Sequence, residues 1–302
     1  EHDSSNLAMP IILSQSSDIT LRLKAAHQAY KNNIFNSESL AALYQTVDFS
    51  YDQLSNSVLK FNNLEMQMSY LFQKANIQLL PITRLETLIN FWFYAEENQL
   101  NLLAYDISRN LIESIEPSAE LHEYGIEIAK AHIYNNNFDL ANKWILFTEN
   151  YISTDSTLES KIQSVKLLYN LKNPLNESNF NDILIQSELF SQEYNDSFKQ
   201  DILLTILSVI DENNDLSFVE NKNFLDQRPM PSRYLLDKIN YASEISSAGE
   251  ILLYINISIQ DKKWFEIHPA HLKVVLKSFK EYFSEDLFNN LIVEILQESK
   301  II

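Results

Sequence analysis

The stretch AKAHIYNNNFDLANKWI, residues 129–145, decides the fold. Two runs at helical spacing flank a polar corner of three asparagines. Ala129 and Ala141 provide small side chains where two antiparallel helices can cross closely, and Phe138 stands near the turn. Asn136 takes the corner position that glycine usually holds. The stretch therefore predicts a helical hairpin, a unit that packs against others of its kind.

The composition excludes many kinds of chemistry. The chain has 302 residues, no cysteine and only two glycines, Gly125 and Gly249. Phosphate-binding loops, nucleophile elbows and tight β-hairpins need glycine, because their backbones take positive φ or approach closely. Disulfides, thiolate nucleophiles, zinc knuckles and iron–sulfur sites need cysteine. Helices joined by short polar corners fit this composition best, which predicts an all-α fold.

Helical periodicity continues along most of the chain, and no segment alternates convincingly with period two. Asn36 and the pair Ser50 and Gln53 have the sequence of helix N-caps, and Pro81 is suited to open a helix. The pattern predicts about fourteen helices. After one that starts near Asp18, the main ones cover 37–46, 62–75, 81–98, 101–115, 118–134, 138–151, 154–173, 179–192, 197–212, 232–246, 248–260, 270–283 and 285–299.

The order of these segments predicts four regions. Residues 1–16 form a loose N-terminal lead-in, and residues 17–211 form a helical-repeat domain. Residues 212–231, ENNDLSFVENKNFLDQRPMP, are rich in Asn, Asp and Pro, which is typical of a loop or linker. Residues 232–302 form C-terminal helical hairpins that continue the array.

The hairpin around Asn136 resembles the turn between the two helices of a tetratricopeptide repeat. In that repeat a small residue, an aromatic near the turn and an early alanine in the second helix follow one another. Phe138 and Ala141 match the last two positions. A similar break precedes Ala104, and 104 to 141 is 37 residues, near the repeat length of about 34 in this class. The remaining hairpins match poorly, so the resemblance implies a TPR-like α-solenoid, a superhelix of stacked antiparallel helical hairpins.

Four further stretches occur in an order that is similar to a group of uncharacterised alphaproteobacterial helical-repeat proteins. They are LAALYQTVDFSYDQLSN (40–56), LETLINFWFYAEENQL (85–100), NNNFDLANKWI (135–145) and SSAGEILLYINISI (246–259). Asn and Lys replace much of the Ala and Arg of that group. The resemblance covers most of residues 20–300 and implies no known activity. It implies export, so we expect the periplasm or cell envelope, with the cytoplasm as the alternative.

The formal net charge of −18 bears on partners. An acidic chain repels phosphate backbones and anionic lipid surfaces, so neither nucleic acid nor a membrane surface is an expected partner. No apolar run approaches the roughly 18 residues that span a bilayer, so no integral membrane segment is expected. The charge favours a protein or peptide partner with a basic or mixed-charge segment. The oligomeric state is left open.

No residue pattern predicts a catalytic, cofactor or metal site. His268 and His271 have the i, i+3 spacing of two ligands, but a third ligand is not visible in sequence and Pro269 fits a helix start. The carboxylates of Glu96, Glu97, Glu113, Glu116 and Glu120 fit a solvated helix face.

We therefore predict a non-enzymatic scaffold that binds a protein or peptide in a solenoid groove. Residues near hairpin corners on adjacent units are the first candidates for contact: Tyr94, Glu97, His132 and Tyr134. The aromatic run 91–94, FWFY, is expected mainly in the core. Two alternatives remain open, an all-α cell-wall enzyme of the lytic transglycosylase type and a peptide-sensing regulator.

Overall fold

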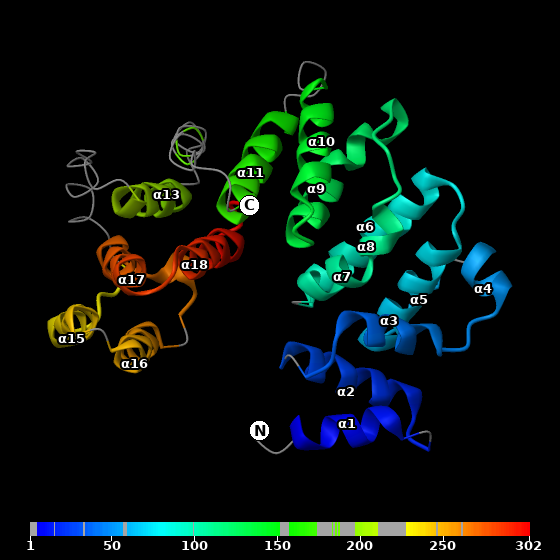
Figure 1. The fold of residues 1–302 in the computed structure, drawn as a ribbon, viewed down its shortest axis with the longest axis horizontal. Helices are drawn as coiled ribbons and strands as arrows, with labels where there is room; N and C mark the ends of the chain where they lie inside the picture. The colour runs from blue at the N-terminus through cyan, green and yellow to red at the C-terminus, as the bar shows by residue number, and fades with distance from the viewer. Residues whose placement is uncertain are drawn as a thin grey trace. The chain divides into compact units, whose positions relative to one another are not determined.

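The fold is all-α. The structure, a computed structural model, describes residues 5–14, 16–32, 34–56, 59–98, 100–151, 157–173, 183, 185, 187, 197–210, 228–245, 247–260 and 262–302. Helices make up 78% of these residues, and no strand occurs among them (Figure 1). Most of the helix expected at 179–192 and most of the linker expected at 212–231 lie outside the described residues.

The chain divides into two compact units by its internal contacts, unit 1 over Glu1–Thr148 and unit 2 over Glu149–Ile302. This division falls between residues 148 and 149, at the end of a helix. The sequence predicts the domain boundary at 212–231 instead. The lead-in expected at 1–16 also differs, because most of it forms a helix, α1 (Ser5–Leu13), that packs against α2 (Ile19–Lys31).

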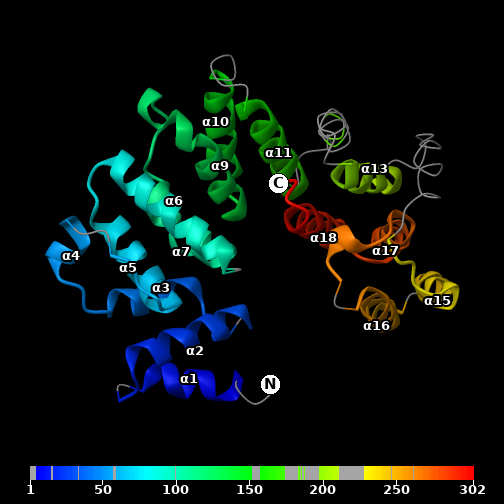
Figure 2. The ribbon, with the colours of Figure 1, turned by 180° about the vertical axis from the view of Figure 1, so that it is seen from behind.

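Unit 1 is a succession of short helices, shown from both sides in Figure 1 and Figure 2. Its elements are α1 (Ser5–Leu13), α2 (Ile19–Lys31), α3 (Ser37–Gln45), α4 (Tyr51–Asn56), α5 (Leu64–Ile77), α6 (Pro81–Glu97), α7 (Asn101–Ile107), α8 (Arg109–Ile112), the 3-10 helix η1 (Ala119–Tyr124), α9 (Gly125–Tyr134) and α10 (Phe138–Glu149). Helix α5 packs against α6 and also contacts α3 and α4.

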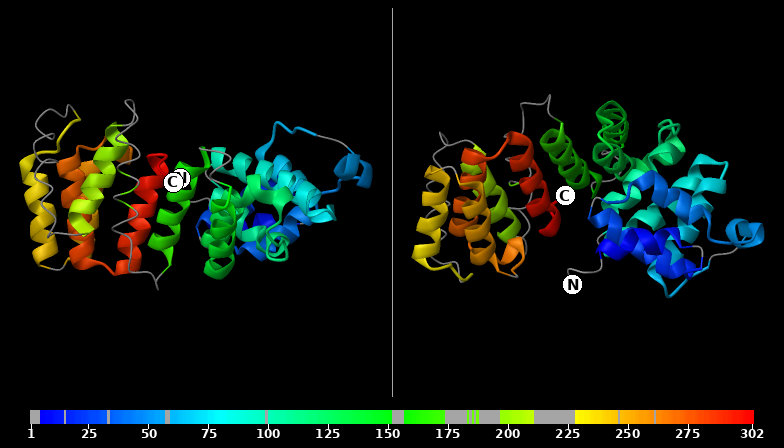
Figure 3. Two further views of the ribbon diagram at one scale, coloured as in Figure 1. Left: turned by 90° about the horizontal axis from the view of Figure 1, so that it is seen from above. Right: turned by 60° about the horizontal axis from the view of Figure 1, so that its bottom comes forward.

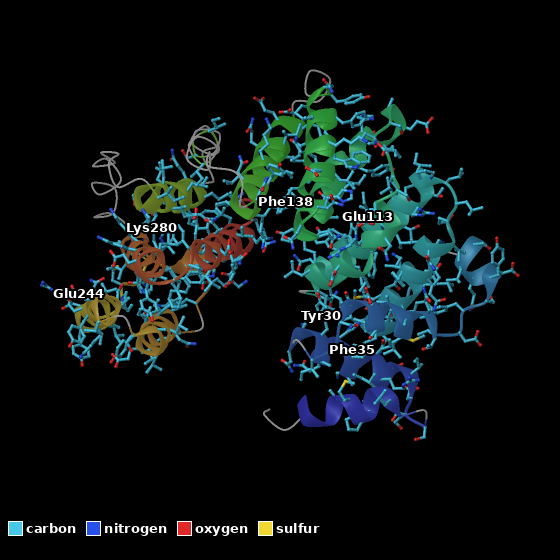
Figure 4. All side chains as sticks on the ribbon, in the orientation of Figure 1. Tyr30, Phe35, Glu113, Phe138, Glu244 and Lys280 are labelled. Carbon is cyan, nitrogen blue, oxygen red and sulfur yellow. The ribbon has the colours of Figure 1, made fainter. Side chains whose placement is uncertain are left out.

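Unit 2 places α17 at its centre, in contact with α13, α15, α16 and α18. Its described elements are α11 (Thr157–Lys172), α13 (Ser197–Ile210), α15 (Arg233–Glu244), α16 (Ala248–Ile259), η2 (Trp264–Glu266), α17 (Pro269–Tyr282) and α18 (Glu285–Glu298). Lys280 of α17 donates to the carbonyls of Val209 and Ile210 at 2.6 and 3.1 Å, and so closes the exposed carbonyl end of α13 (Figure 4).

The predicted helix starts are confirmed where side chains cap them. The Oδ1 of Asn36 accepts from the backbone N–H of Ser39 at 2.8 Å. Ser50 and Gln53 form a reciprocal capping box, with distances of 2.8 and 3.3 Å. Each bond satisfies an N–H that has no partner within its own helix.

Two predicted helices are interrupted. The segment 101–115 breaks at Ser108, whose hydroxyl donates to the carbonyl of Ala104 at 2.7 Å and accepts from Trp92 Nε1 at 2.9 Å. A buried serine that bonds back to the preceding turn bends a helix. The segment 118–134 begins as 3-10 helix over η1, and the Ser118 side chain makes no capping bond.

Helix corners in both units share one hydrogen-bond pattern. At the α9–α10 corner the N–H of Asn137 donates to the carbonyl of His132 at 2.8 Å. Asn136 lies between them with φ 57°, so it does take the left-handed position of glycine. At the α6–α7 corner the N–H of Leu100 donates to the carbonyl of Ala95 at 2.8 Å. Leu100 and Asn137 are 37 residues apart, the spacing that the sequence shows between Ala104 and Ala141.

The inner residues of these hairpins are small. Ala95, Ala104, Ala129 and Ala141 have no exposed surface. The open end of the α9–α10 hairpin is also tight, because a Cβ added to Gly125 would overlap the hydroxyl of the buried Thr148. Helix crossings of this kind depend on small side chains at the contact.

The two glycines provide a matched test of this close contact. Gly125→Ala should lower the free energy of unfolding by about 1–3 kcal/mol, because the new methyl group overpacks against Thr148. Gly249→Ala meets nothing within 4 Å, so it should be neutral or stabilise the protein by up to about 1 kcal/mol. Urea denaturation of both variants measures the difference. Equal stability of the two variants would contradict the tight α9–α10 contact.

Candidate partner-binding groove

A groove of about 410 Å³ opens in unit 1 between α5, α6 and the segment that precedes α5. We call it the α5–α6 groove. Side chains from these three elements line it: Leu59, Lys60, Phe61, Gln67, Tyr70, Leu71, Lys74, Thr87, Asn90, Phe93, Tyr94 and Glu97. Residues on α5 and α6 recur there at helical spacing, so one face of each helix forms a wall.

The wall that precedes α5 is held by polar bonds and by an aromatic cluster. The N–H of Phe61 donates to Gln67 Oε1 at 2.7 Å, and the N–H of Leu59 donates to the Tyr70 hydroxyl at 3.3 Å. The rings of Phe49, Phe61 and Tyr70 have pairwise centroid distances of 5.6 Å. Such ring contacts add stability beyond the area they bury, so this side of the groove is preformed.

The aromatic run on α6 divides between core and groove. Phe91 and Trp92 are buried, as expected, and the Trp92 ring lies 5.4 Å from that of Tyr105. Phe93 and Tyr94 point elsewhere and line the groove, and 62% of Phe93 is exposed. Four consecutive residues cover most of the circumference of a helix, so a helix with one open side cannot bury all four.

Charged groups stand beside the aromatic lining. Lys60 and Glu97 are exposed, and Lys74 Nζ lies 5.6 Å from the centre of the Tyr70 ring and 3.4 Å from its hydroxyl oxygen. Partial burial raises the pKa of the Tyr94 phenol, and the carboxylates of Glu65 and Glu97 raise it further. Tyr94 is therefore a neutral hydrogen-bond donor at physiological pH.

The four residues chosen from the sequence fall into two places. Tyr94 and Glu97 lie together in the groove lining. His132 and Tyr134 belong to α9 and are not among the residues that line it. The Tyr134 ring stacks on that of Tyr105, with the centroids 5.2 Å apart and the planes at 2°. This stacking explains its half-buried position.

His132 requires a correction. It has no exposed surface, and neither ring nitrogen has a hydrogen-bond partner among the described residues. A direct contact between His132 and a partner is therefore inconsistent with this structure. Burial lowers its pKa to about 4, so the ring is neutral near pH 7. The sequence could not show this, because corner spacing does not reveal which side of α9 faces inward.

Unit 1 has a second, wider groove of about 790 Å³ between the end of α2 and α7. Tyr30 and Phe35, labelled in Figure 4, contribute to its lining. Burial raises the pKa of Tyr30, and the charge of Asp106 and a hydrogen bond to it raise this pKa further. Asp106 also pairs with Arg109 at 3.2 Å. Tyr30 and Phe35 are the aromatic residues that line this wider groove, whereas four aromatic side chains line the α5–α6 groove.

The other residues weighed from the sequence have structural partners. His268 caps α17, since its Nδ1 accepts from the N–H of Ala270 at 3.1 Å. His271 Nε2 lies 2.9 Å from the Ser258 hydroxyl. Within the described ranges no three His, Asp or Glu side chains are grouped to hold a metal ion. The five carboxylates from Glu96 to Glu120 are all exposed, and Glu116 pairs with Lys143.

Comparison with known proteins adds no relative. No protein-family model, curated protein or solved structure matches the chain. The resemblances to tetratricopeptide repeats and to alphaproteobacterial helical-repeat proteins stay predictions from the quoted motifs. In the described part of the chain, none of the helices has the length and apolar composition needed to cross a bilayer.

The buried His132 predicts a pH-dependent stability. Its pKa is about 4 in the folded protein and about 6.5 in the unfolded chain, so the unfolded chain binds more protons between these values. Above pH 6.5 the neutral ring contributes fully to the free energy of unfolding. This contribution is lost as the pH falls towards 4. By pH 5 the loss is about 2 kcal/mol.

Replacement of this ring should remove that part of the acid sensitivity. Between pH 7 and pH 5 the free energy of unfolding of His132→Leu should fall by about 2 kcal/mol less than that of the wild type. Urea denaturation at both pH values measures this difference. Ile133→Val, a neighbouring core substitution without a titratable group, should keep the wild-type pH dependence. An unchanged pH dependence in His132→Leu would mean that its ring is accessible to protons in the folded state.

Proposed function

We propose that the chain is a non-enzymatic scaffold of the TPR-like α-solenoid type, which binds a peptide segment of another protein in the α5–α6 groove. Two features support the hairpin arrangement. The α6–α7 and α9–α10 corners are closed by the same backbone bond 37 residues apart, and both place a fully buried alanine early in the second helix. Stacked hairpins of this kind present extended surfaces that suit a peptide or a partner domain.

The exposed aromatic lining is the single observation that carries the proposal. Phe93 is 62% exposed on a helix that buries the two preceding aromatics, and Tyr94 lies beside it in the same groove. Aromatic side chains are enriched among residues that dominate binding energy, since they bury a large area at a small cost in side-chain entropy. A peptide with an apolar or aromatic anchor would cover Phe93, and the Tyr94 hydroxyl would bond its backbone.

The charges around the groove favour a mixed-charge partner segment. Lys60, which precedes α5, and Lys74 of α5 line the groove together with Glu97, the last residue of α6. An acidic group on the peptide would face the lysines, and a basic group would face Glu97 and the acidic surface of a chain with net charge −18. Such contacts at a solvated rim weaken as salt rises.

The test is selection from a random peptide library on the purified chain, followed by affinity measurement of the selected peptide. Phe93→Ala and Tyr94→Ala should each raise Kd by about 10-fold or more. The matched control is Tyr51→Ala, which removes a tyrosine that is 74% exposed and does not line the groove, and it should leave Kd unchanged. The wild-type Kd should also rise with salt concentration.

Two outcomes would overturn the proposal. One is a selected peptide whose affinity is the same for wild type, Phe93→Ala and Tyr94→Ala, because it then binds elsewhere. The other is cleavage of peptidoglycan by the purified wild-type chain that Glu97→Gln abolishes, which would favour the enzyme alternative.

A further inference from the structure

Helix α15 lies at one end of unit 2 (Figure 3), where α16 and α17 pack against it. Tyr234, Tyr241 and Ile245, which follows the helix, are 67, 53 and 48% exposed. Lys238 lies between the two tyrosines, with its Nζ 5.5 and 5.7 Å from their ring centres. We call these four residues the α15 stripe.

The opposite side of α15 is buried within unit 2. Ile239, Ala242 and Ser243 are buried, and the helix contacts α16 and α17. The stripe is therefore not a misplaced core face, since unit 2 already packs this helix on its other side. Tyrosine and isoleucine in this number are unusual on a solvated helix, and a row of them marks a protein contact surface.

The spacing of the stripe identifies the kind of contact. Residues 234, 238, 241 and 245 are separated by four, three and four positions, which is the a/d spacing of a helix that packs against a second helix. In an antiparallel pair of identical helices, the a position of one faces the d position of the other. Tyr234 then faces Ile245 of the second copy, and Lys238 faces its Tyr241.

The charges at the ends fit the same antiparallel arrangement. Arg233 stands at the start of α15 and Glu244, labelled in Figure 4, at its end, and both are exposed. Asp237 lies one turn after Arg233 and already pairs with it at 4.0 Å. An antiparallel pair brings Arg233 of each copy near Glu244 of the other, so the contact is self-complementary at both ends.

We propose that the α15 stripe joins two copies of this chain into a two-fold dimer by antiparallel packing of α15. The ring faces of Tyr234 and Tyr241 supply the apolar contact, and the Lys238 stem lies across a tyrosine of the second copy. This proposal does not depend on the peptide groove, which belongs to unit 1. Two linked copies would present two such grooves to a partner with repeated motifs.

Sedimentation velocity over a concentration series tests the dimer. The wild type should show a concentration-dependent shift from monomer to dimer. Tyr241→Lys should raise the dimer dissociation constant at least about 10-fold, because it places a positive charge opposite Lys238 of the second copy. Tyr51→Lys, which changes a tyrosine that is 74% exposed on α4 of unit 1, should behave as wild type.

A charge exchange tests the antiparallel register. Arg233→Glu and Glu244→Arg should each weaken the dimer, and the double variant should recover most of the wild-type association. Thermal melts monitored by circular dichroism verify that each variant is folded. A wild type that stays monomeric at every concentration, equal behaviour of Tyr241→Lys and Tyr51→Lys, or a double variant as weak as the single ones would overturn the proposal.

The absence of cysteine allows a second, independent measurement. Lys238 lies next to the two-fold axis of the proposed dimer, so Lys238→Cys should crosslink to the same position of a second copy with a short bismaleimide. Tyr51→Cys is the control and should not. Crosslinking of both variants to the same extent, or of neither, contradicts the proposed register.

Discussion

The structure depends on how its helices end. A helix leaves backbone carbonyls without partners at its last turn, and many helices close that turn with a glycine in the left-handed conformation. This chain has only Gly125 and Gly249, and both lie within helices. The bond from the sixth residue back to the first that closes such a corner, as between Asn137 and His132, therefore forms here without glycine. The positive φ falls on Asn136 there, and on Lys300 after α18.

That closure has a consequence for packing. A left-handed residue with a side chain costs about 1–2 kcal/mol, so the corner persists only where the two helices beyond it gain more by packing. Fully buried alanines beside the corners, Ala95, Ala104 and Ala141, allow the close approach that supplies this gain. Corner and crossing therefore stabilise each other at the α6–α7 and α9–α10 corners of unit 1.

The sequence predicts those structural features that depend only on residues close together in the chain. N-caps at Asn36 and Ser50 and the left-handed Asn136 are readable, because each depends on neighbours within a few residues. The break at Ser108 is not readable, since its hydroxyl accepts from Trp92, sixteen residues away. The same limit applies to the candidate site. The helical periodicity of α5 and α6 indicates which residues share a face of each helix. Only the tertiary packing shows that Phe93 is exposed and that His132 is buried.

The two surfaces proposed for recognition share one origin. In each, a helix carries more aromatic or apolar side chains than its own neighbours can cover, as with Phe93 on α6 and Tyr241 on α15. A solvent-facing aromatic gains little for the isolated fold, so both surfaces are suited to a contact outside the unit. The polar groups beside them then decide what kind of contact it is. The unlike charges at the two ends of α15 are self-complementary, whereas Lys60, Lys74 and Glu97 form no such pattern and suit a different chain.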